Sequence, residues 1–499
     1  MSRARGAARR FPMLLALALA WPRPAAAQTA PAQRPRPNIL LVLLDDIGVD
    51  KLGAYGLAPP GTEPPCTPNI DALAAEGLLF THAWANPVCS PTRAQILTGR
   101  HGFRTGIGTI IEHQGTELGL SATLEVTLPE ILAGYDNAYV GKWHLAHPTR
   151  DGLRHAIECG FQSYAGTLFN ISTPPIACGP ACVPPDCAAA GLLGYSNWVK
   201  VEASAASPRA TQTCVTTYAT SATADDAIAR AAALQAPWFL EVSFNAAHLP
   251  AEQPPAALAP AGEACARRYR AARARADVLN AMVSALDTEL GRMLAAIRRV
   301  DPGVVILLLS DNGTSIPAAQ GPARSCFALG RSKGSLYEGG IRVPLIVAGP
   351  NVARGRCDAL VSATDLFATI AELAGVPHAA ADSVSLVPYL MGNSTPRRAT
   401  VYAELFRPNF VSPDAEGQPR FAPTTHTRAL RNTRFKLIRA LDSEGAVEEL
   451  FFDLANDPCE EVDLLVPRAA SQATVGLSDE QRVNLAALRA ELEVLGVQR

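Results

Sequence analysis

Five apolar segments of strand length, separated by helical segments, constrain the fold of this chain more than any other feature of its sequence. They are residues 38–44, 135–141, 238–244, 304–310 and 341–348. Runs of this length with few polar residues are typical of strands that are buried on both faces of a parallel sheet. Their alternation with helices predicts an α/β fold, a large mixed, mostly parallel sheet sandwiched by helices.

Two of the intervening helices have clear sequence signals. Thr67 and Pro68 fit the N-cap and the first position of a helix that Gly77 ends. Residues 275–300 carry apolar side chains at spacings of three and four, which predicts a long amphipathic helix.

Beyond a loop-like stretch at residues 383–396, the pattern changes to shorter strands. The candidates are residues 401–405, 427–439 and 448–454. A last helix follows, with Ser478 and Gln481 as a capping box. We predict a main α/β domain at residues 37–385 and a smaller C-terminal α+β domain, an antiparallel sheet plus a helix, at residues 397–499.

The first 27 residues have the three parts of a secretory signal peptide. Four arginines form a positive head, residues 13–21 form a short apolar core, and Ala25 to Ala27 form a small-residue cleavage site. The apolar core is too short to span a bilayer, and no later stretch is long and apolar enough to do so. We therefore expect a signal peptide at residues 1–27 and an exported protein, either periplasmic or secreted.

The composition restricts the class of partner. The chain is 48% hydrophobic and 18% charged, which is typical of a globular protein with a sizeable core. The formal net charge is only −2. Neither sign is in the excess that would indicate a nucleic acid or an anionic membrane as partner.

Polar side chains follow four of the five predicted strands, at the point where each strand ends. Asp45 and Asp46 follow the first strand, Lys142 and His144 the second, His248 the third, and Asp311 and Asn312 the fourth. In an open α/β sheet, ligands bind in the crevice beyond the carboxyl ends of the strands. We therefore expect these four clusters to share one edge of the sheet.

The oxygen-bearing side chains in these clusters suit a divalent cation. Asp45, Asp46, Asp311 and Asn312 offer three carboxylates and an amide, which hard cations such as Ca²⁺ or Mg²⁺ prefer. Taken alone, Asp311-Asn312-Gly313 is also typical of a tight turn, and Asp45-Asp46 of a strand end that meets a helix cap. Four clusters on one edge favour a metal site with room for a substrate.

The segment Cys89-Ser90-Pro91-Thr92-Arg93 has the signals of a helix N-terminus. Ser90 fits the N-cap and Pro91 the first helical position, and Gly99 would end the helix. Cys89 would then lie where backbone N–H groups and the helix dipole favour negative charge. Arg93, one turn into the helix, can reach back over that point.

This segment, followed by Thr98-Gly99, resembles the Cys-x-Pro-x-Arg signature of the type I sulfatase family, in the alkaline phosphatase-like superfamily. Further blocks resemble that family in the same order, over about residues 37–465. They are Asn38 to Asp46, Gly141-Lys142-Trp143-His144, Lys333 to Pro344, and Phe452-Asp453-Leu454 with Asp457-Pro458. A resemblance in this order and spacing is far more specific than the five-residue signature alone.

In that family, a formylglycine-generating enzyme converts the cysteine to formylglycine, whose hydrate is the nucleophile. The resemblance implies that Cys89 is converted in this way. It also implies a metal site for one Ca²⁺, with Mg²⁺ as the alternative, made by Asp45, Asp46, Asp311, Asn312 and the modified Cys89. One hydroxyl of the hydrate would attack sulfur, and the other would then lose its proton and expel sulfate, which a plain cysteine or serine could not do.

The same resemblance assigns the other catalytic roles. Arg93 would steady the hydrate, and Lys142 and Lys333 would contact the sulfate oxygens. His144 would assist deprotonation of the second hydroxyl, and His248, with Lys333, would protonate the leaving oxygen. The substrate would be a small-molecule or carbohydrate sulfate ester, and its identity stays open.

The eleven cysteines suit an oxidising compartment. If Cys89 is converted, ten are left that could pair. Five lie close together in a proline-rich stretch: Cys159, Cys178, Cys182, Cys187 and Cys214. Zinc is the alternative to disulfides here, but no histidine lies among the five and their spacing lacks a paired repeat. We predict a disulfide-linked loop of open connectivity, and we expect residues 160–219 to shape the pocket for the leaving group.

Three other functions stay open at this level. A phosphonate monoester or phosphodiester hydrolase of the same superfamily would share the nucleophile and the metal, and Lys142 with His144 favours sulfate by analogy. A non-catalytic relative would bind metal without turnover, although every expected catalytic position is filled. A thiol enzyme would keep a free thiol at Cys89. It also stays open whether Asn170 or Ser172 touches the sulfate.

Overall fold

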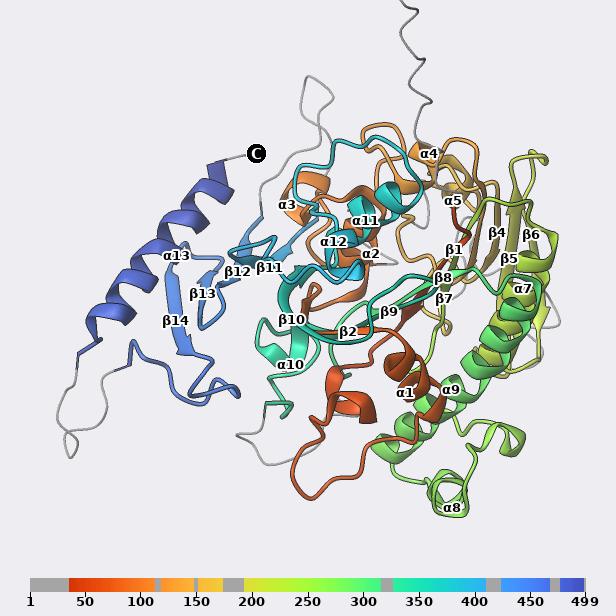
Figure 1. The fold of residues 1–499 in the computed structure, drawn as a ribbon, viewed down its shortest axis with the longest axis horizontal. Coiled ribbons are helices and arrows are strands. Elements are labelled where there is room, and N and C mark those ends of the chain that lie inside the picture. The colour runs from red at the N-terminus through yellow and green to blue at the C-terminus, as the bar shows by residue number, and fades with distance from the viewer. Residues whose placement is uncertain are drawn as a thin grey trace, which may run out of the picture. The chain divides into compact units, whose positions relative to one another are not determined.

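The computed structural model describes residues 36–112, 118–147, 151–173, 193–315, 326–409, 423–466 and 476–497. Within them the predicted fold class is confirmed. A ten-stranded, mostly parallel mixed sheet lies between helices, and a separate four-stranded antiparallel sheet follows it in the chain (Figure 1). The predicted signal peptide and three of the clustered cysteines (Cys178, Cys182 and Cys187) lie outside the described residues.

The large sheet has the strand order β10-β2-β9-β8-β1-β7-β3-β4-β5-β6. Its strands are β1 (Ile39–Leu44), β2 (Leu78–Trp84), β3 (Asp136–Gly141), β4 (Ser163–Gly166), β5 (Trp198–Ser204), β6 (Thr211–Val215), β7 (Trp238–Ser243), β8 (Val305–Ser310), β9 (Arg342–Ala348) and β10 (Gly355–Ser362). The four central strands β8, β1, β7 and β3 are parallel neighbours. Their carboxyl ends therefore lie on one edge of the sheet.

One strand that we predicted for the parallel part of the sheet runs the other way. Strand β9 is antiparallel to both of its neighbours, β8 and β2. The backbone N–H of Gly313, just after β8, donates to Gly340 O at 2.9 Å. The chain thus comes back to the edge where β8 ends and has to re-enter the sheet in the reverse direction.

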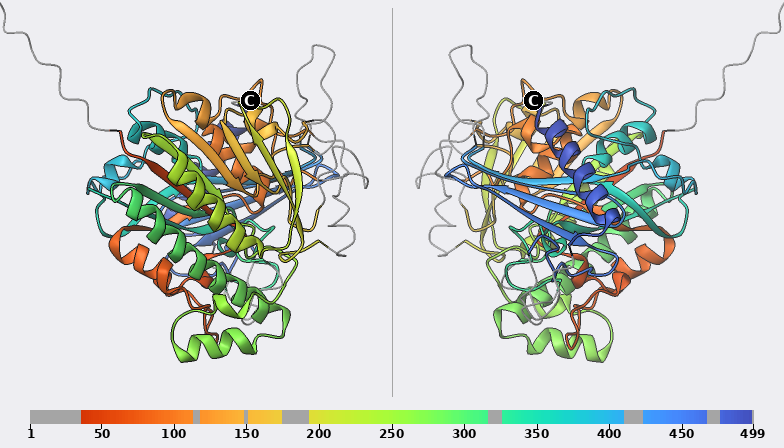
Figure 2. Two further views of the ribbon diagram at one scale, coloured as in Figure 1. Left: turned by 90° about the vertical axis from the view of Figure 1, so that its right-hand side faces the viewer. Right: turned by 90° about the vertical axis from the view of Figure 1, so that its left-hand side faces the viewer.

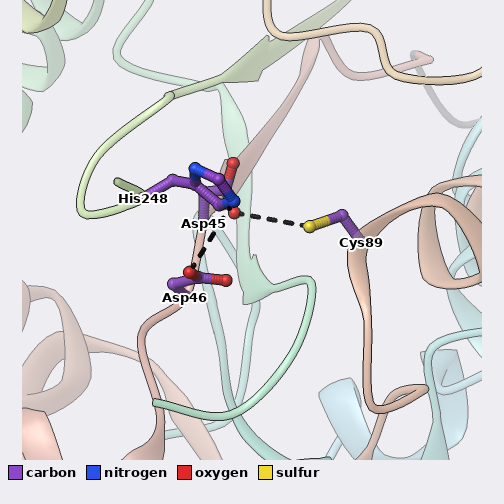
Figure 3. A group of neighbouring side chains, drawn as sticks. All are labelled: Asp45, Asp46, Cys89 and His248. Atoms are coloured by element: carbon purple, nitrogen blue, oxygen red, sulfur yellow. Dashed lines mark hydrogen bonds and ion pairs between the residues drawn. The ribbon is translucent and has the colours of Figure 1, made fainter. Parts of the chain in front are cut away.

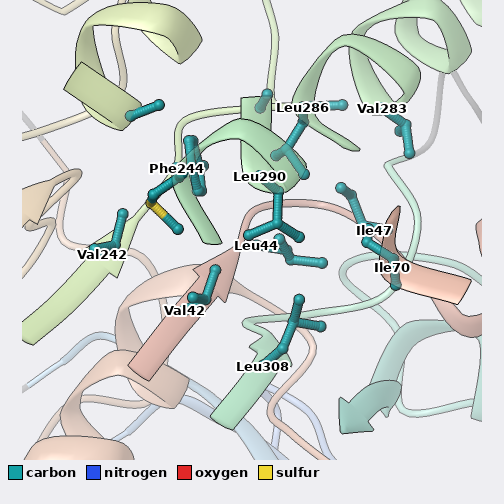
Figure 4. Packing of buried hydrophobic residues seen from close by; sticks show 14 of the residues in the cluster. Val42, Leu44, Ile47, Ile70, Val242, Phe244, Val283, Leu286, Leu290 and Leu308 are labelled. Atoms are coloured by element: carbon teal, nitrogen blue, oxygen red, sulfur yellow. The ribbon is translucent and has the colours of Figure 1, made fainter. Parts of the chain in front are cut away.

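The sheet is buried on both faces, because successive side chains of a strand point to opposite sides. Leu40, Val42 and Leu44 of β1 belong to one apolar cluster, and Ile39, Leu41 and Leu43 to another. Helices α1 (Pro68–Glu76), α7 (Ala219–Ala233) and α9 (Arg275–Val300) supply the first cluster, and α2 (Cys89–Thr98) and α11 (Asp365–Leu373) the second. Figure 4 shows the α9 side chain Leu290 beside Leu44, with Leu286 of the same helix beyond it.

The bounds of α1 and α9 confirm the two helices predicted from their sequence signals. The other helices that precede the C-terminal sheet in the described part of the chain are short. They are α3 (Gly102–Thr105), α4 (Leu128–Ile131), α5 (His155–Glu158), α8 (Glu263–Ala271), α10 (Glu338–Ile341) and α12 (Val387–Leu390), with 3-10 turns η1 (Val49–Lys51), η2 (Gly53–Tyr55) and η4 (Ala256–Leu258).

The C-terminal sheet consists of β11 (Val401–Arg407), β12 (Thr425–Arg431), β13 (Phe435–Leu441) and β14 (Val447–Asp453), in sequential antiparallel order. The single strand that we predicted at residues 427–439 is wrong, because this segment is a hairpin. The side-chain oxygen of Asn432 accepts hydrogen bonds from the backbone N–H groups of Arg434 and Phe435 and fixes the turn.

The last helix, α13 (Asp479–Val497), packs on one face of this sheet (Figure 2). Its Leu485, Leu488 and Leu492 share an apolar cluster with residues of all four strands, among them Tyr402 of β11 and Phe451 of β14. The predicted capping box is confirmed by reciprocal hydrogen bonds between Ser478 and Gln481. None of the helices in the described part of the chain is long and apolar enough to cross a membrane.

The cysteines pair less completely than we predicted. Disulfides join Cys66 to Cys265 and Cys326 to Cys459, and Cys214 is also disulfide-bonded. Cys159, however, has a free thiol, as do Cys89 and Cys357. The expectation that Cys159 belongs to a disulfide-linked loop is therefore wrong. Its side chain is fully buried and packs in the apolar cluster that contains Ile39, Leu41 and Leu43 of β1.

Candidate active site

The four polar clusters that follow the central strands meet at one edge of the sheet. Lys142, after β3, donates to Asp45 Oδ2, after β1, at 2.5 Å. The backbone N–H of Asp46 donates to Asp311 Oδ1, after β8, at 3.4 Å. His248, after β7, has Nε2 at 4.0 Å from Asp46 Oδ2. The parallel order of these strands brings together residues that are far apart in the sequence.

Cys89 is the first residue of α2, so the helix begins two positions earlier than we predicted. Val88 is the N-cap, and the Ser90 hydroxyl accepts a hydrogen bond from the N–H of Ile111 instead of capping the helix. Pro91 is the third helical residue, where an N–H has no partner within the helix. Gly99 ends α2 with φ 64°, as expected for a glycine that closes a helix.

The Cys89 sulfur is buried and surrounded by charged groups. Its Sγ lies 3.7 Å from Asp45 Oδ1, 3.6 Å from Lys142 Nζ and 3.5 Å from Lys333 Nζ. Burial raises the pKa of the Cys89 thiol to about 12, although the two lysines oppose this shift. A thiol with this pKa is not ionised at neutral pH, which argues against its direct use as a thiolate nucleophile.

Cys89 also belongs to a group of possible metal ligands. Asp45, Asp46, Cys89 and His248 each offer one ligand atom, and these atoms lie within 4.8 Å of one another (Figure 3). Asn312 Nδ2 donates to Asp46 Oδ1 at 2.8 Å, while Asn312 Oδ1 is buried without a hydrogen-bond partner among the described residues. An unpartnered amide oxygen beside carboxylates fits a hard divalent cation.

Asp311 is not one of these four residues, and its carboxylate is held by Arg93. The Arg93 guanidinium donates to Asp311 Oδ2 through Nε at 3.0 Å and Nη2 at 2.7 Å. Its Nη1 donates to Lys142 O and to Ser243 Oγ. Arg93 thus connects three strand ends, and no hydrogen bond joins it to Cys89 within the described residues.

The charges at this edge are closely balanced. Burial would raise the pKa of Asp45, but Lys142 and the other nearby cations hold it well below its usual range. Lys333 Nζ donates to Asp46 Oδ1 at 2.5 Å, and burial raises the pKa of Asp46 against the effect of this lysine. Two ammonium groups near Cys89 form a place where a sulfate group would be stabilised.

Both histidines at this edge favour the neutral form. Burial, with help from Lys142, lowers the pKa of His144 well below its usual value. Its Nδ1 is buried and has no hydrogen-bond partner among the described residues. Burial, Lys333 and Lys142 lower the pKa of His248 to about 3. Because His248 Nδ1 faces the Leu249 carbonyl at 2.8 Å, this nitrogen carries the proton and Nε2 faces the site.

Two supporting residues were missed at the sequence level. Ser243 Oγ accepts from Arg93, and the Tyr139 hydroxyl donates to Lys142 O at 2.5 Å. A signal for Ser243 is present in the sequence, because Glu241 and Ser243 interrupt an otherwise apolar strand on one face. Asn170 Oδ1 is also buried without a partner among the described residues, and the choice between Asn170 and Ser172 stays open.

Comparison with known proteins gives a consistent result. The sulfatase family model matches residues 37–376, and a model described as N-sulphoglucosamine sulphohydrolase, C-terminal, matches residues 331–485. Canine N-acetylgalactosamine-6-sulfatase is 32% identical over 388 residues, which cover 73% of this chain and 68% of the relative. Human arylsulfatase A is 31% identical over 485 residues, which cover 92% of this chain and 87% of the relative.

Solved structures agree with this at the level of the fold. The crystal structure of Ps i-CgsB in complex with k-i-k-neocarrahexaose superposes with a TM-score of 0.68 at 23% identity, and covers 93% of both chains. The structure of BT4656 in complex with D-glucosamine-2-N,6-O-disulfate has a TM-score of 0.62 at 19% identity, and covers 92% of this chain and 98% of the other. Together with the match to the family model, these comparisons show that the chain belongs to the sulfatase family and is a sulfuric ester hydrolase.

Proposed function

We propose that this protein is an exported sulfatase that cleaves a sulfate ester into an alcohol and inorganic sulfate, using formylglycine made from Cys89 and one bound Ca²⁺, or alternatively Mg²⁺. The position of Cys89 is the observation that carries the proposal. Its Sγ lies within 3.7 Å of Asp45, Lys142 and Lys333. A nucleophile at this point would lie beside the carboxylates of the cation site and beside two ammonium groups that could bind the sulfate oxygens.

We further propose how the chain is matured and divided. Residues 1–27 would direct export, residues 37–385 would form the catalytic domain, and residues 397–499 would form the C-terminal domain. Cys89 is 0% exposed in the folded chain. A formylglycine-generating enzyme would therefore have to act before the protein folds.

The metal would be held by Asp45, Asp46, Asp311, Asn312 and the modified residue 89. When present, the cation and the formylglycine hydrate supply a polarised hydroxyl nucleophile for sulfur. Asn312 would turn its unpartnered Oδ1 towards the cation, while Arg93 keeps the Asp311 carboxylate in place through two hydrogen bonds.

The remaining polar residues would bind the sulfate and move protons. Lys142 and Lys333 would donate to the sulfate oxygens, since both Nζ atoms lie next to position 89. His144 would accept a proton at its unpartnered Nδ1. His248 would give a proton from Nε2 to the leaving oxygen, and an anionic substrate between His248 and Lys333 would favour the cationic imidazolium that this requires.

The test uses protein produced together with a formylglycine-generating enzyme and Ca²⁺. Turnover of an aryl sulfate is compared with turnover of the matching aryl phosphonate monoester, and peptide mass spectrometry reads the residue at position 89. A strong preference for the sulfate, with an aldehyde at position 89, supports the proposal. A preference for the phosphonate would assign the chain to the other hydrolase group, and an unmodified thiol in active protein would remove formylglycine from the mechanism.

A further inference from the structure

An arginine-rich segment stands out from the nearly neutral chain. Residues 267–275, which we call the arginine arm, carry five exposed arginines: Arg267, Arg268, Arg270, Arg273 and Arg275. The arm spans the end of α8 and the start of α9. Only two carboxylates, Glu263 and Asp277, lie within the surrounding residues 263–277.

Most of this positive charge has no counter-charge on the protein. Arg268 forms an ion pair with Glu63 at 2.6 Å. Arg273 donates to the carbonyl oxygens of Arg270 and Ala272, which holds the turn between the two helices. Within the described residues, the other arginines of the arm make no ion pair. An anionic partner could therefore bind them without first breaking a salt bridge.

The arm lies on the same edge of the sheet as the candidate active site. At the far end of α9, the side chain of Asp301 accepts a hydrogen bond from Asn38, which immediately precedes β1. The C-terminus of α9 is thus beside the start of β1, so its N-terminus points past the end of β1, where Asp45 lies. Leu290 packs beside Leu44, and fifteen helical residues from there back to Arg275 extend about 22 Å beyond it. Figure 1 shows α8 at this end of α9.

A surface cavity connects the arm with the chain segment that carries His248. This cavity of about 540 Å³ is lined by Gln253 and Pro254 on one side and by Tyr269, Arg270 and Arg273 on the other. Its volume is in the range of sites that hold small ligands. Gln253 is five residues after His248, so their Cα atoms are at most about 18 Å apart. Part of a long substrate could lie in the cavity while another part is in the active site.

We propose that the arginine arm binds the anionic chain of a sulfated polysaccharide, and that such a polymer is the substrate class of this enzyme. This inference rests on the proposed sulfatase function. Guanidinium groups bind oxyanions through paired N–H donors, and they lose less hydration than ammonium groups do. One small sulfate ester fits the site at Cys89 and does not extend to the arm, whereas a chain with repeated sulfates contacts both.

The composition of the arm favours a polysaccharide over a single-stranded nucleic acid. Non-specific binding of single strands combines basic grooves with exposed aromatic rings on which bases stack. Tyr269 is the only aromatic residue in residues 263–277, and it is 3% exposed. The arm thus offers charge without a stacking surface, as a sulfated sugar chain requires.

The test compares a triple variant with a matched control in the mature full-length chain. The arm variant is Arg267→Gln, Arg270→Gln, Arg275→Gln, and it keeps Arg273 because this residue holds the turn. The control is Arg299→Gln, Arg354→Gln, Arg397→Gln, which removes three exposed arginines from other parts of the surface. Both are combined with Cys89→Ala, and their binding to size-fractionated dextran sulfate is measured from 50 to 200 mM salt.

The arm variant should bind dextran sulfate at least about tenfold more weakly at 50 mM salt than the control does. Its slope of log affinity against log salt should be shallower by up to about 2, since each released counterion contributes about 0.7 or more on a dense polyanion. Equal binding by the two variants would overturn the proposal. Tighter binding of single-stranded DNA than of dextran sulfate by the parent protein would overturn the choice of partner.

A second measurement separates this inference from the proposed function. With Cys89 present and converted, the ratio of kcat/KM for a sulfated polysaccharide to kcat/KM for an aryl sulfate should fall about tenfold in the arm variant and stay constant in the control. An equal fall on both substrates would mean that the arm only supports the fold. If no sulfate ester is turned over, the proposed function fails, and the binding experiment still decides whether the arm binds a sulfated polymer.

Discussion

Replacing Asp311 by alanine should destabilise the metal-free protein by about 3 kcal/mol. Asp311 is fully buried, and its Oδ2 accepts two hydrogen bonds from the buried Arg93 guanidinium. Breaking a buried ion pair from one side costs about 3–5 kcal/mol, because the other charge stays buried without compensation. We expect the lower end of this range, since Asp45 Oδ2 remains 3.6 Å from Arg93 Nη2.

The assay is urea denaturation of the purified mature chain, first with a chelator and then with excess Ca²⁺. At a free concentration of 100 times Kd, a bound ion adds about 2.7 kcal/mol to the stability of the wild type. The Asp311→Ala variant should gain much less, because it has also lost a proposed ligand. The difference between the two proteins should therefore widen from about 3 kcal/mol to about 5 kcal/mol or more when Ca²⁺ is added.

A double variant, Arg93→Met with Asp311→Leu, is the control. Apolar residues of similar volume often replace a buried ion pair at little cost, so this variant should be more stable than Asp311→Ala, although inactive. The reasoning is refuted if Asp311→Ala costs less than about 1 kcal/mol without metal. It is equally refuted if the separate effects of Arg93→Met and Asp311→Leu on the free energy of unfolding add up to that of the double variant within about 0.5 kcal/mol, as they do for independent sites.

Three further results are expected. Cys89→Ala should abolish turnover and keep the near-UV circular dichroism of the wild type, and turnover at the wild-type rate would remove residue 89 from the mechanism. Leu290→Ala, in the core below β1, should lower the free energy of unfolding by about 2–5 kcal/mol in denaturant titrations without a change in KM; a loss below 1 kcal/mol would contradict the packing. Burial raises the pKa of Glu241 from 4.5 to about 8. Between these two pH values the folded state keeps a proton on Glu241 that the unfolded state has lost. The contribution of this group to the free energy of unfolding therefore falls as the pH rises from about 4.5 to about 8. Glu241→Gln should therefore gain stability over the wild type as pH rises to about 8 and then level off, and a constant difference across this range would show that Glu241 is ionised in the fold.

Elements with a strong local pattern could be predicted closely from the sequence. The predicted helix at residues 275–300 has the same bounds as α9, because a 26-residue apolar stripe depends only on local spacing. The residue at which the helix carrying Cys89 begins was predicted two positions too late, although its end at Gly99 was correct. A glycine with positive φ is a stronger local signal than a serine, whose hydroxyl can bind elsewhere, as Ser90 does with Ile111.

Features that depend on distant partners could not be predicted in this way. The direction of β9 depends on where the chain returns after β8, which the apolar run at 341–348 does not encode. Cys159 keeps a free thiol because it is buried in the core, and the number of cysteines in the sequence does not indicate which of them are buried. Arg93 was expected to act directly over Cys89, whereas its hydrogen bonds go to Asp311, Lys142 and Ser243.

The sequence by itself determined which residues stand at the ends of the buried strands and that Cys89 lies near the start of a helix, because apolar runs and helix signals are local properties. The tertiary structure alone decided which of these residues touch. Lys333 reaches Asp46 across 287 positions, and Arg93 reaches Asp311 across 218. Such contacts depend on strand order and on the fold of the segment between β8 and β9. The chemistry of the site therefore follows from long-range packing, while its residue types can be read from the chain.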